Sequence, residues 1–475
     1  MVFSSMIFLW GFLPLVLITY YFIDKKYKNF VLLISSLLFY SFGEPRYIIL
    51  MILSVIINYI FGILVNQAKD IGKRKLYLII AIFSNLLILA YFKYFNFFRQ
   101  VIYSLLNLNS IEVKEIILPI GISFYTFQAL SYVVDVYRGK NEENGTKVQK
   151  NIFDLALYIS FFPQLIAGPI VKYYDIEKQL RNREENITRI AYGIKRFIFG
   201  LSKKVLISNV LASTADKIFV LPIDGVGTSL AWLGLICYTI QIYYDFSGYS
   251  DMAIGLGEIF GFRFMENFNY PYISKSIREF WRRWHISLST WFREYLYIPL
   301  GGNRKGNIRT YINLLIVFFA TGLWHGASFN FIIWGMMHGF FIVIERMFLG
   351  KYLAKKGLAV LSSIYTMFVV MVAWVFFRIE TFNGAISYLK VLFKYRVGSR
   401  VNNINIYLNN EVILTIIIGI LFCGIIQSIF KKLKNDIFLE EEIKTYQIII
   451  LVILLSLCIL SMVSGTYNPF IYFRF

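Results

Sequence analysis

The chain has 475 residues, of which 58% are hydrophobic, 19% aromatic and only 16% charged, whereas soluble domains carry charge on about 25% of their residues. A mean hydropathy of +0.61 excludes an ordinary soluble protein and indicates an integral membrane protein. The formal net charge of +20 comes from lysines and arginines spread through short loops. The positive-inside rule explains this charge without nucleic-acid binding.

Apolar runs that could cross a bilayer recur along the chain, and they predict helices because they lack the strict alternation of barrel strands. The run at 1–17 has no basic residue before it and no cleavage site after it, so we expect a retained first span rather than a signal peptide. Basic loops follow this span and the third, at about 47–65, which predicts an N-terminus outside. Two more spans are expected at 76–92 and 116–136.

The segment 152–171 interrupts this alternation, because basic loops flank it on both sides. It contains Pro163, Gly168 and Pro169, and we expect a re-entrant piece whose broken backbone is buried in protein. Further spans are expected at 190–219, 230–260, 309–326, 358–377, 413–430 and 448–462, with a returning helix after residue 330. The pattern predicts roughly twelve crossings, with 263–309 in the cytoplasm and the C-terminus outside.

Two of the three histidines lie in the apolar stretch LWHGASFNFIIWGMMHG, at 323–339. An ionisable side chain inside a span is costly, so such a residue indicates a functional site. His325 lies 16 residues after Arg309, and a rise of 1.5 Å per residue puts it roughly 24 Å across the membrane, near the outer side. After a turn, His338 on the returning span is expected to have a packing role.

The surroundings of His325 favour a functional histidine over one that is merely satisfied by a backbone carbonyl. Gly322 and Gly326 are expected to leave room for a substrate, and Asn330 offers a polar partner. We therefore treat His325 as the leading candidate for chemistry.

The third histidine, His285, lies in SKSIREFWRRWHISLSTWFREYLYIPLGGNRKG. On one continuous helix it would share a face with Arg278, Arg282 and Arg293. Such a basic face fits an interfacial helix anchored in anionic headgroups, and it equally fits a cytoplasmic site for an anionic donor. Both interpretations stay open from the residues alone.

A second polar patch is YTIQIYYDFSGYSDMAIGLGEIFGF, which places Asp245, Ser250 and Asp251 inside a predicted span. Carboxylates in lipid require a cavity or a partner. They could orient a histidine or pair with a nearby arginine, and structural pairing is the expected role. Three scattered cysteines and three histidines predict neither a disulfide framework nor a metal site.

Together these segments resemble the membrane-bound O-acyltransferase family, most closely its alginate O-acetyltransferase and teichoic acid D-alanyltransferase branch. The matching stretches run through 118–348 and include LPIGISFYTFQALSYVVDVYRG, FFPQLIAGPIV, WRRWHISLSTWFREYLYIPLGGNR and TGLWHGASFNFIIWG, with FIYFRF at the C-terminus. The resemblance implies an all-α polytopic membrane protein: a ring of about 11–13 transmembrane helices with re-entrant segments and a central tunnel. We expect one domain over 1–475, with a family core at 118–348 and an external aromatic tail at 464–475.

The resemblance also implies an activity in a bacterial cytoplasmic membrane. An acyl group, usually acetyl, would pass from a cytoplasmic thioester, either acetyl-CoA or an acyl carrier protein, to a cell-surface or secreted polysaccharide. No permanently bound cofactor is expected. The implied partners are the lipid bilayer, an external hydrolase-fold (SGNH-like) protein, and the polysaccharide or its synthase complex, but no nucleic acid.

The family's histidines match His325 in WHG and His285 in RRWH. A thioester is already activated, so one base that takes a proton from the attacking hydroxyl suffices, and the ordinary pKa of histidine suits this role. We expect His325 to be that base and His285 to assist on the donor side. The tail hydroxyl of Tyr472 could relay the acyl group outward, or the tail could be an aromatic anchor at the outer interface.

Three alternatives compete with this interpretation. D-alanyl transfer to teichoic acid belongs to the same branch, but the intact alginate-type stretch around His285 favours acetylation. A proton-coupled transporter should show inverted repeats, and none is found. A non-catalytic scaffold would leave the basic face near His285 and the segment around His325 without a purpose.

Overall fold

The computed structural model describes residues 2–106, 115–139, 145–429, 444–465 and 467–471, and these residues form helices and no strands. Among these described residues, five helices are long and apolar enough to cross a membrane. They span Ile48–Gln67, Ile71–Leu105, Phe329–Leu353, Lys356–Arg378 and Thr445–Ser464. The prediction of an all-helical, multi-pass membrane protein is therefore confirmed. The chain divides into two compact units, Met1–Gly193 with Ala253–Met265, and Ile194–Met252 with Glu266–Phe475.

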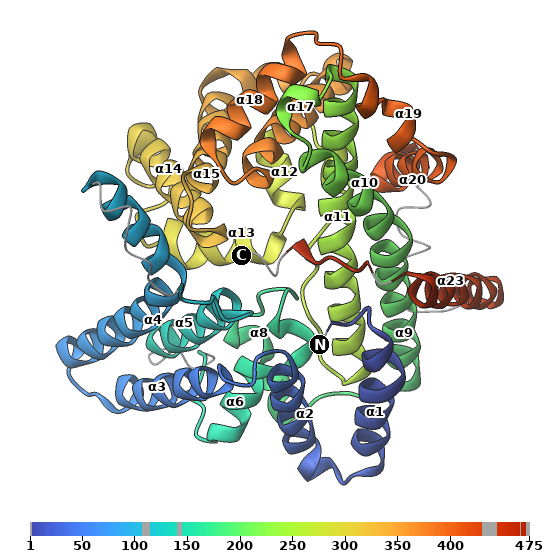
Figure 1. The fold of residues 1–475 in the computed structure, drawn as a ribbon. Helices are drawn as coiled ribbons and strands as arrows, with labels where there is room; N and C mark the ends of the chain where they lie inside the picture. Colours follow the sequence, from blue (N-terminus) through green and yellow to red (C-terminus); the bar gives the residue numbers. More distant parts are fainter. Residues whose placement is uncertain (1, 107–114, 140–144, 430–443, 466, 472–475) are drawn as a thin grey trace. The chain divides into compact units, whose positions relative to one another are not determined.

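The first unit is built from the N-terminal helices. They are η1 Phe8–Phe12, α1 Leu13–Phe22, η2 Lys25–Tyr27, α2 Lys28–Gly43, α3 Ile48–Gln67, α4 Ile71–Leu105, α5 Ile122–Gly139, α6 Ile152–Ser160, α7 Phe162–Leu165, α8 Tyr173–Arg181 and the start of α9 Ile187–Ser202. Helices α3, α4 and α5 lie side by side (Figure 1). The helix α4 is longer than the expected span at both ends. It begins at Ile71 because Asp70 caps it by accepting a hydrogen bond from the backbone of Lys73 at 2.8 Å.

The predicted re-entrant piece is a broken, buried helix pair. Helix α6 ends at Ser160 and α7 begins at Phe162, with Pro163 in its first turn. A Cβ atom on Gly168 would lie 2.5 Å from the Cα of Gln164, so only glycine fits this turn. Every residue from 157 to 173 is buried, as a broken backbone in a membrane protein requires.

The second unit holds the remaining helices. They are η3 Lys203–Ser208, α10 Asn209–Phe219, η4 Ile223–Gly225, α11 Thr228–Ile259 up to Met252, η5 Pro271–Ile273, α12 Ile277–Arg283, α13 Ile286–Phe292, η6 Arg293–Tyr297, α14 Gly306–His325, α15 Phe329–Ile344, η7 Glu345–Leu349, α16 Gly350–Leu353, η8 Lys356–Leu358, α17 Ala359–Arg378, α18 Phe382–Phe393, η9 Arg400–Asn402, α19 Ile404–Tyr407, α20 Asn410–Ile420, η10 Leu421–Ile425, α21 Ile426–Ile429 and α23 Thr445–Ser464.

The hairpin of α14 and α15 corrects one expectation. A Cβ atom on Gly322 would lie 2.4 Å from the carbonyl oxygen of Phe331, and one on Gly326 would lie 2.2 Å from the Phe331 ring. These glycines allow the two helices to approach closely (Figure 1). The prediction that they leave room for a substrate is wrong, because α15 fills that space.

The helix expected around His285 is also broken. Helix α12 ends at Arg283 and α13 begins at Ile286, with His285 between them at φ 44°, in the left-handed region. The loop residue Asn267 holds this break, because its backbone carbonyl accepts from the amide of Ile286 at 2.9 Å. The predicted single helical face that joins His285 to the arginines is therefore wrong.

Ion pairs tie α9 and η3 to α11. In the first unit Arg189 lies 2.8 Å from Glu258. In the second unit Arg196 lies 2.6 Å from Asp251, and Lys203 reaches the same carboxylate at 2.5 Å. The basic residues are spaced seven apart in the chain, which keeps them on one face of the helix. This spacing was the signal that could have predicted the pairing.

Candidate functional site

His325 is the last residue of α14 and is 1% exposed. Its ring packs against three aromatic side chains, with centroid distances of 5.0 Å to Trp324, 4.8 Å to Trp334 and 5.2 Å to Phe377. The turn that follows leads into α15, which Ser328 caps. The turn was expected here, and it allows α15 to return alongside α14.

His285 is fully buried and its tautomer follows from its neighbours. The Oδ1 of Asn267 lies 3.1 Å from His285 Nδ1 and also accepts from the backbone N–H of Ser287 at 3.2 Å. A backbone N–H can only donate, so the atom that faces it must be the amide oxygen. The Nδ1 of His285 therefore carries the proton and donates, which leaves the lone pair on Nε2.

The Nε2 of His285 has no hydrogen-bond partner within the described part of the chain. Complete burial lowers the pKa of His285 to about 3, so the imidazole is neutral near pH 7. A neutral ring with a free lone pair on Nε2 can accept a hydrogen bond from a substrate or donor group. Sequence reasoning found His285 but missed Asn267, which lies 18 residues earlier in a loop.

The three histidines belong to one aromatic cluster. Trp324 contacts both His285 and His325, with centroid distances of 5.9 Å and 5.0 Å. Trp334 contacts His338 at 5.2 Å, and His338 also stacks on Phe280 with an interplanar angle of 5°. His338 is fully buried and both its ring nitrogens lack a hydrogen-bond partner among the described residues, which agrees with a packing role.

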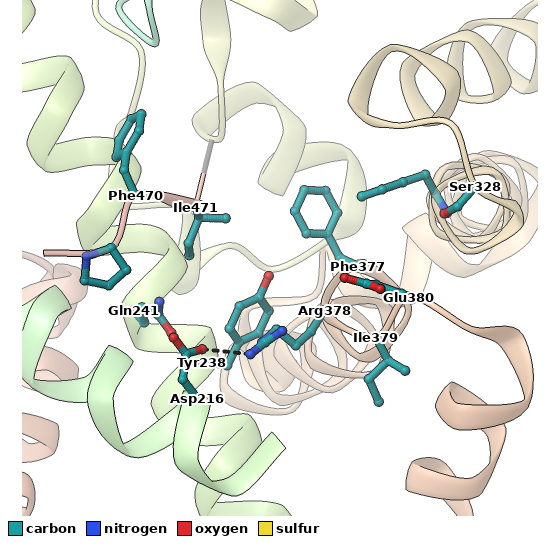
Figure 2. Close-up of a pocket in the computed structure, with 12 residues that line it drawn as sticks. Asp216, Tyr238, Gln241, Ser328, Phe377, Arg378, Ile379, Glu380, Phe470 and Ile471 are labelled. Carbon is teal, nitrogen blue, oxygen red and sulfur yellow. Dashed lines mark hydrogen bonds and ion pairs between the residues drawn. The ribbon is translucent and has the colours of Figure 1, made fainter. Parts of the chain in front are cut away.

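A cavity of about 160 Å³ lies beside this cluster, and its wall includes Phe377, the ring on which His325 packs. Ser328 from the turn after α14 and Ile471 from the C-terminal tail also line it (Figure 2). Arg378 pairs with Asp216 at 2.7 Å across one side of the cavity. The cavity therefore brings the region of His325 and the tail together.

The tail is held by the polar patch of α11. Asp245 is buried and pairs with Lys204 of η3 at 2.5 Å. Its second oxygen accepts from the backbone N–H of Ile471 at 2.8 Å. Asp245 thus pairs with a lysine, where an arginine or a histidine was expected, and it contacts a segment more than 200 residues away in the sequence.

The other candidate polar residues have separate surroundings. Asp251 pairs with Arg196 and Lys203, as the expectation of structural pairing required. The hydroxyl of Ser250 is buried and has no hydrogen-bond partner within the described segments. Asn330 donates to the carbonyl of Ile379 at 2.5 Å, which ties α15 to the end of α17.

The arginines of the expected donor face do meet, although not on one helix. Arg278 and Arg282 from α12, Arg293 from η6 and Arg346 from η7 line a cavity of about 270 Å³ with an apolar floor that includes Phe292. All four arginines are exposed. Four guanidinium groups around one cavity are suited to binding an anion. His285 does not line it.

Tyr472, the expected acyl relay, lies outside the described residues. Ile471, the residue before it, lines the cavity beside Phe377. No group of three or more His, Cys, Asp or Glu side chains that could hold a metal ion occurs in the portion of the chain that the structure describes.

Comparisons with known proteins agree with the resemblance. The chain matches the membrane-bound O-acyltransferase family over residues 37–387. It is 45% identical to the probable alginate O-acetylase AlgI of Pseudomonas aeruginosa over 83% of this chain and 75% of that protein. It is 40% identical to the probable alginate O-acetylase AlgI of Pseudomonas putida over 100% of both.

A relative named for a different polymer is also similar. The peptidoglycan O-acetyltransferase of Helicobacter pylori is 36% identical over 82% of this chain and 79% of that protein. The family match covers both candidate histidines, and the similarity extends over nearly all of the chain. The chain belongs to the membrane-bound O-acyltransferase family.

Proposed function

We propose that this protein is an O-acetyltransferase that passes acetyl groups from a cytoplasmic thioester to hydroxyl groups of a cell-surface or secreted polysaccharide. The observation that carries this proposal is the similarity, over the whole chain, to a protein named as a probable alginate O-acetylase. The buried histidine cluster and the two cavities supply the chemical groups that such a transfer needs.

We propose a single polytopic domain over 1–475 in the bacterial cytoplasmic membrane. It would form a ring of about 11–13 crossings around a tunnel, with the core at 118–348, both termini outside, and α6 with α7 as a re-entrant piece. The charge pattern of the loops supports this orientation. The tunnel would join a cytoplasmic donor to an external acceptor.

In this proposal His325 is the general base. It takes the proton of the acceptor hydroxyl as the oxygen attacks the thioester carbonyl, the carbon–sulfur bond breaks, and the thiolate leaves with that proton. The products are the acetyl ester and the free thiol. Because His325 is 1% exposed, water that would hydrolyse the thioester is kept away.

The donor would bind at the cavity that Arg278, Arg282, Arg293 and Arg346 line, here called the arginine cavity. Acetyl-CoA and the prosthetic group of an acyl carrier protein both carry phosphate, which arginine binds through paired, charge-assisted hydrogen bonds. Arg278, Arg282, Arg293 and Arg346 would hold that phosphate, and His285, through its Nε2 lone pair, would assist on the donor side. No permanently bound cofactor is required.

The external step would involve the C-terminal tail. The hydroxyl of Tyr472 is a candidate acyl relay: it would accept the acetyl group, with loss of its proton, and would recover a proton when an external acceptor hydroxyl takes the acetyl group. The position of Ile471 at the cavity supports this role. An external hydrolase-fold (SGNH-like) protein and the polysaccharide synthase are the expected partners.

The alternative within the family is D-alanyl transfer to teichoic acid, and one experiment separates the two. A strain that lacks the gene is complemented with the wild-type gene, and its surface polymers are isolated and treated with mild base. Released acetate that depends on the gene supports the proposal. Released D-alanine in place of acetate would support the alternative, and a release of neither would remove both and return a transporter to consideration.

A further inference from the structure

The tail residues 467–471 are held through their main chain by two buried side chains of the second unit. The ammonium of Lys204 donates to the carbonyl oxygen of Pro469. The carboxylate of Asp245 accepts from the N–H of Ile471 at 2.8 Å. These two bonds hold the backbone on either side of Phe470.

Lys204 and Asp245 form an ion pair at 2.5 Å in which the side chains are only 3% and 1% exposed. Burying two charges is expensive, and replacing such a pair by apolar side chains is often neutral or stabilising. A contribution to the stability of the fold therefore does not explain why this ion pair is buried. Each charge also makes a hydrogen bond to the tail, and that is the role an apolar pair could not fill.

The packing of Phe470 determines which tail residues lie beside the Lys204–Asp245 ion pair. Its ring is buried, with a centroid 4.8 Å from that of Tyr249 and 5.7 Å from the ammonium of Lys204. Pro469 has no N–H, so its carbonyl is the only polar backbone group that it presents. The two hydrogen bonds to the tail and the buried Phe470 ring together allow one register of the tail. In that register Ile471 lines the cavity beside Phe377 (Figure 2).

We propose that Lys204 and Asp245 are positioning residues for acyl transfer, which clamp the tail main chain at Pro469 and Ile471 and so hold Ile471 against the cavity in one register. This inference rests on the proposed role of the tail in that transfer. Both clamp bonds go to backbone atoms of the tail. Two tail side chains make hydrogen bonds of their own: the Tyr467 hydroxyl donates to Asp216, and Asn468 Oδ1 accepts from Asn209 Nδ2 at 3.2 Å.

A charge swap separates a clamp from a simple ion pair. The double variant Lys204→Asp with Asp245→Lys restores opposite charges between η3 and α11. It also places a donor against the N–H of Ile471 and an acceptor against the carbonyl of Pro469, so neither tail bond can form. The apolar double variant Lys204→Met with Asp245→Leu removes both charges without leaving one unpaired, and it keeps the test valid if the swap does not fold.

Tail release is measured directly in the full-length protein. Ile471→Cys is added as a reporter, and its rate of reaction with a maleimide is compared in each background. The native cysteines Cys237, Cys423 and Cys458 are buried, and a reporter-free protein corrects for them. Lys203→Met is the matched control, since Lys203 neighbours Lys204 but pairs with Asp251, which also holds Arg196.

The clamp predicts at least tenfold faster labelling in both double variants, the wild-type rate in Lys203→Met, and a loss of polymer acetylation on the order of 10²-fold in reporter-free double variants. Labelling at the wild-type rate in the swap variant would overturn the clamp. Fast labelling with full acetylation would overturn the positioning role while leaving the acetyltransferase assignment intact. Absence of acetylation in the wild type, with the expected labelling, would remove the proposed function and not the clamp.

Discussion

Asn267 sets the chemistry of His285, because its amide oxygen keeps the proton on Nδ1. Burial holds the pKa of His285 at about 3, so the ring stays neutral as the pH falls from about 8 to 5. A variant that puts a negative charge at Asn267 would favour the protonated ring and raise its pKa. The neutral form of the His285 imidazole is then lost at a higher pH than in the wild type.

We therefore predict that Asn267→Asp moves the acid limb of the pH profile of acetyl transfer upward, while activity near pH 8 is retained because the carboxylate still accepts from Nδ1. Transfer rates in inverted membrane vesicles between about pH 5 and 8 measure this. Asn267→Leu, which removes the acceptor, should lower the rate on the order of 10²-fold at every pH. An unchanged profile in Asn267→Asp would argue against a role for His285.

At the level of single residues, the sequence located the histidines but not the groups that control them. Asn267 is an ordinary loop residue until the fold brings it to His285. The partner of Asp245 is Lys204, and its identity depends on the π-helical turn η3, which places Lys203 and Lys204 on two different carboxylates of α11. Such a widened π-helical turn is common at functional sites, but nothing in the sequence marks it here.

Close packing between helices depends on glycine residues, which have no Cβ atom, at the points of contact. In the second unit a Cβ atom on Gly200 would lie 2.5 Å from the carbonyl oxygen of Gly248 and 2.7 Å from the amide of Met252. Both neighbours are backbone atoms, so α9 and α11 would have to separate. Gly200→Ala should therefore destabilise the protein by about 1–3 kcal/mol.

Thermal unfolding of the detergent-solubilised protein, followed by size exclusion, measures this effect. Gly11→Ala is the control, because a Cβ atom there meets nothing within 4 Å, and it should leave the unfolding temperature unchanged or slightly raised. Equal stability of Gly200→Ala and Gly11→Ala would show that α9 and α11 do not require this close contact.

At the scale of the short helices α12 and η6, the arginine cavity leads to a prediction for donor binding. Arg282→Gln with Arg293→Gln should raise the KM for the donor by at least tenfold, because hydrogen bonds to charged groups contribute about 1.5–3 kcal/mol each. The rate is measured against donor concentration in vesicles, separately for acetyl-CoA and an acetylated acyl carrier protein. Arg304→Gln, an exposed arginine outside the cavity, is the control. A KM unchanged for both donors would remove this cavity as the donor site.

The arginine cavity also shows why the helical projection around His285 gave a wrong prediction. The projection assumed one helix, but the left-handed backbone of His285 turns α13 away from α12. A left-handed residue that is not glycine needs tertiary contacts to hold it, and these come from a distant loop. The arginines met nevertheless, because the fold brings η6 and η7 to α12.

Across the whole molecule, hydropathy and charge were sufficient for the class of protein and for most helices. The expected spans near 47–65 and 358–377 correspond to α3 and α17 within a few residues. The broken piece with Pro163 was also predicted, because proline and glycine interrupt helices locally. The course of the C-terminal tail could not be predicted, because its contacts with Lys204 and Asp245 join segments far apart in the sequence.

The central claim is that His325, and not His338, is the base of acetyl transfer. The matched variants His325→Phe and His338→Phe both keep an aromatic ring in the cluster and remove the imidazole nitrogens. Base-released acetate from the surface polymer is measured in a gene-deletion strain that carries each variant at equal membrane levels. The account predicts background acetate for His325→Phe and near wild-type acetate for His338→Phe. Wild-type acetate in the His325→Phe strain would contradict it.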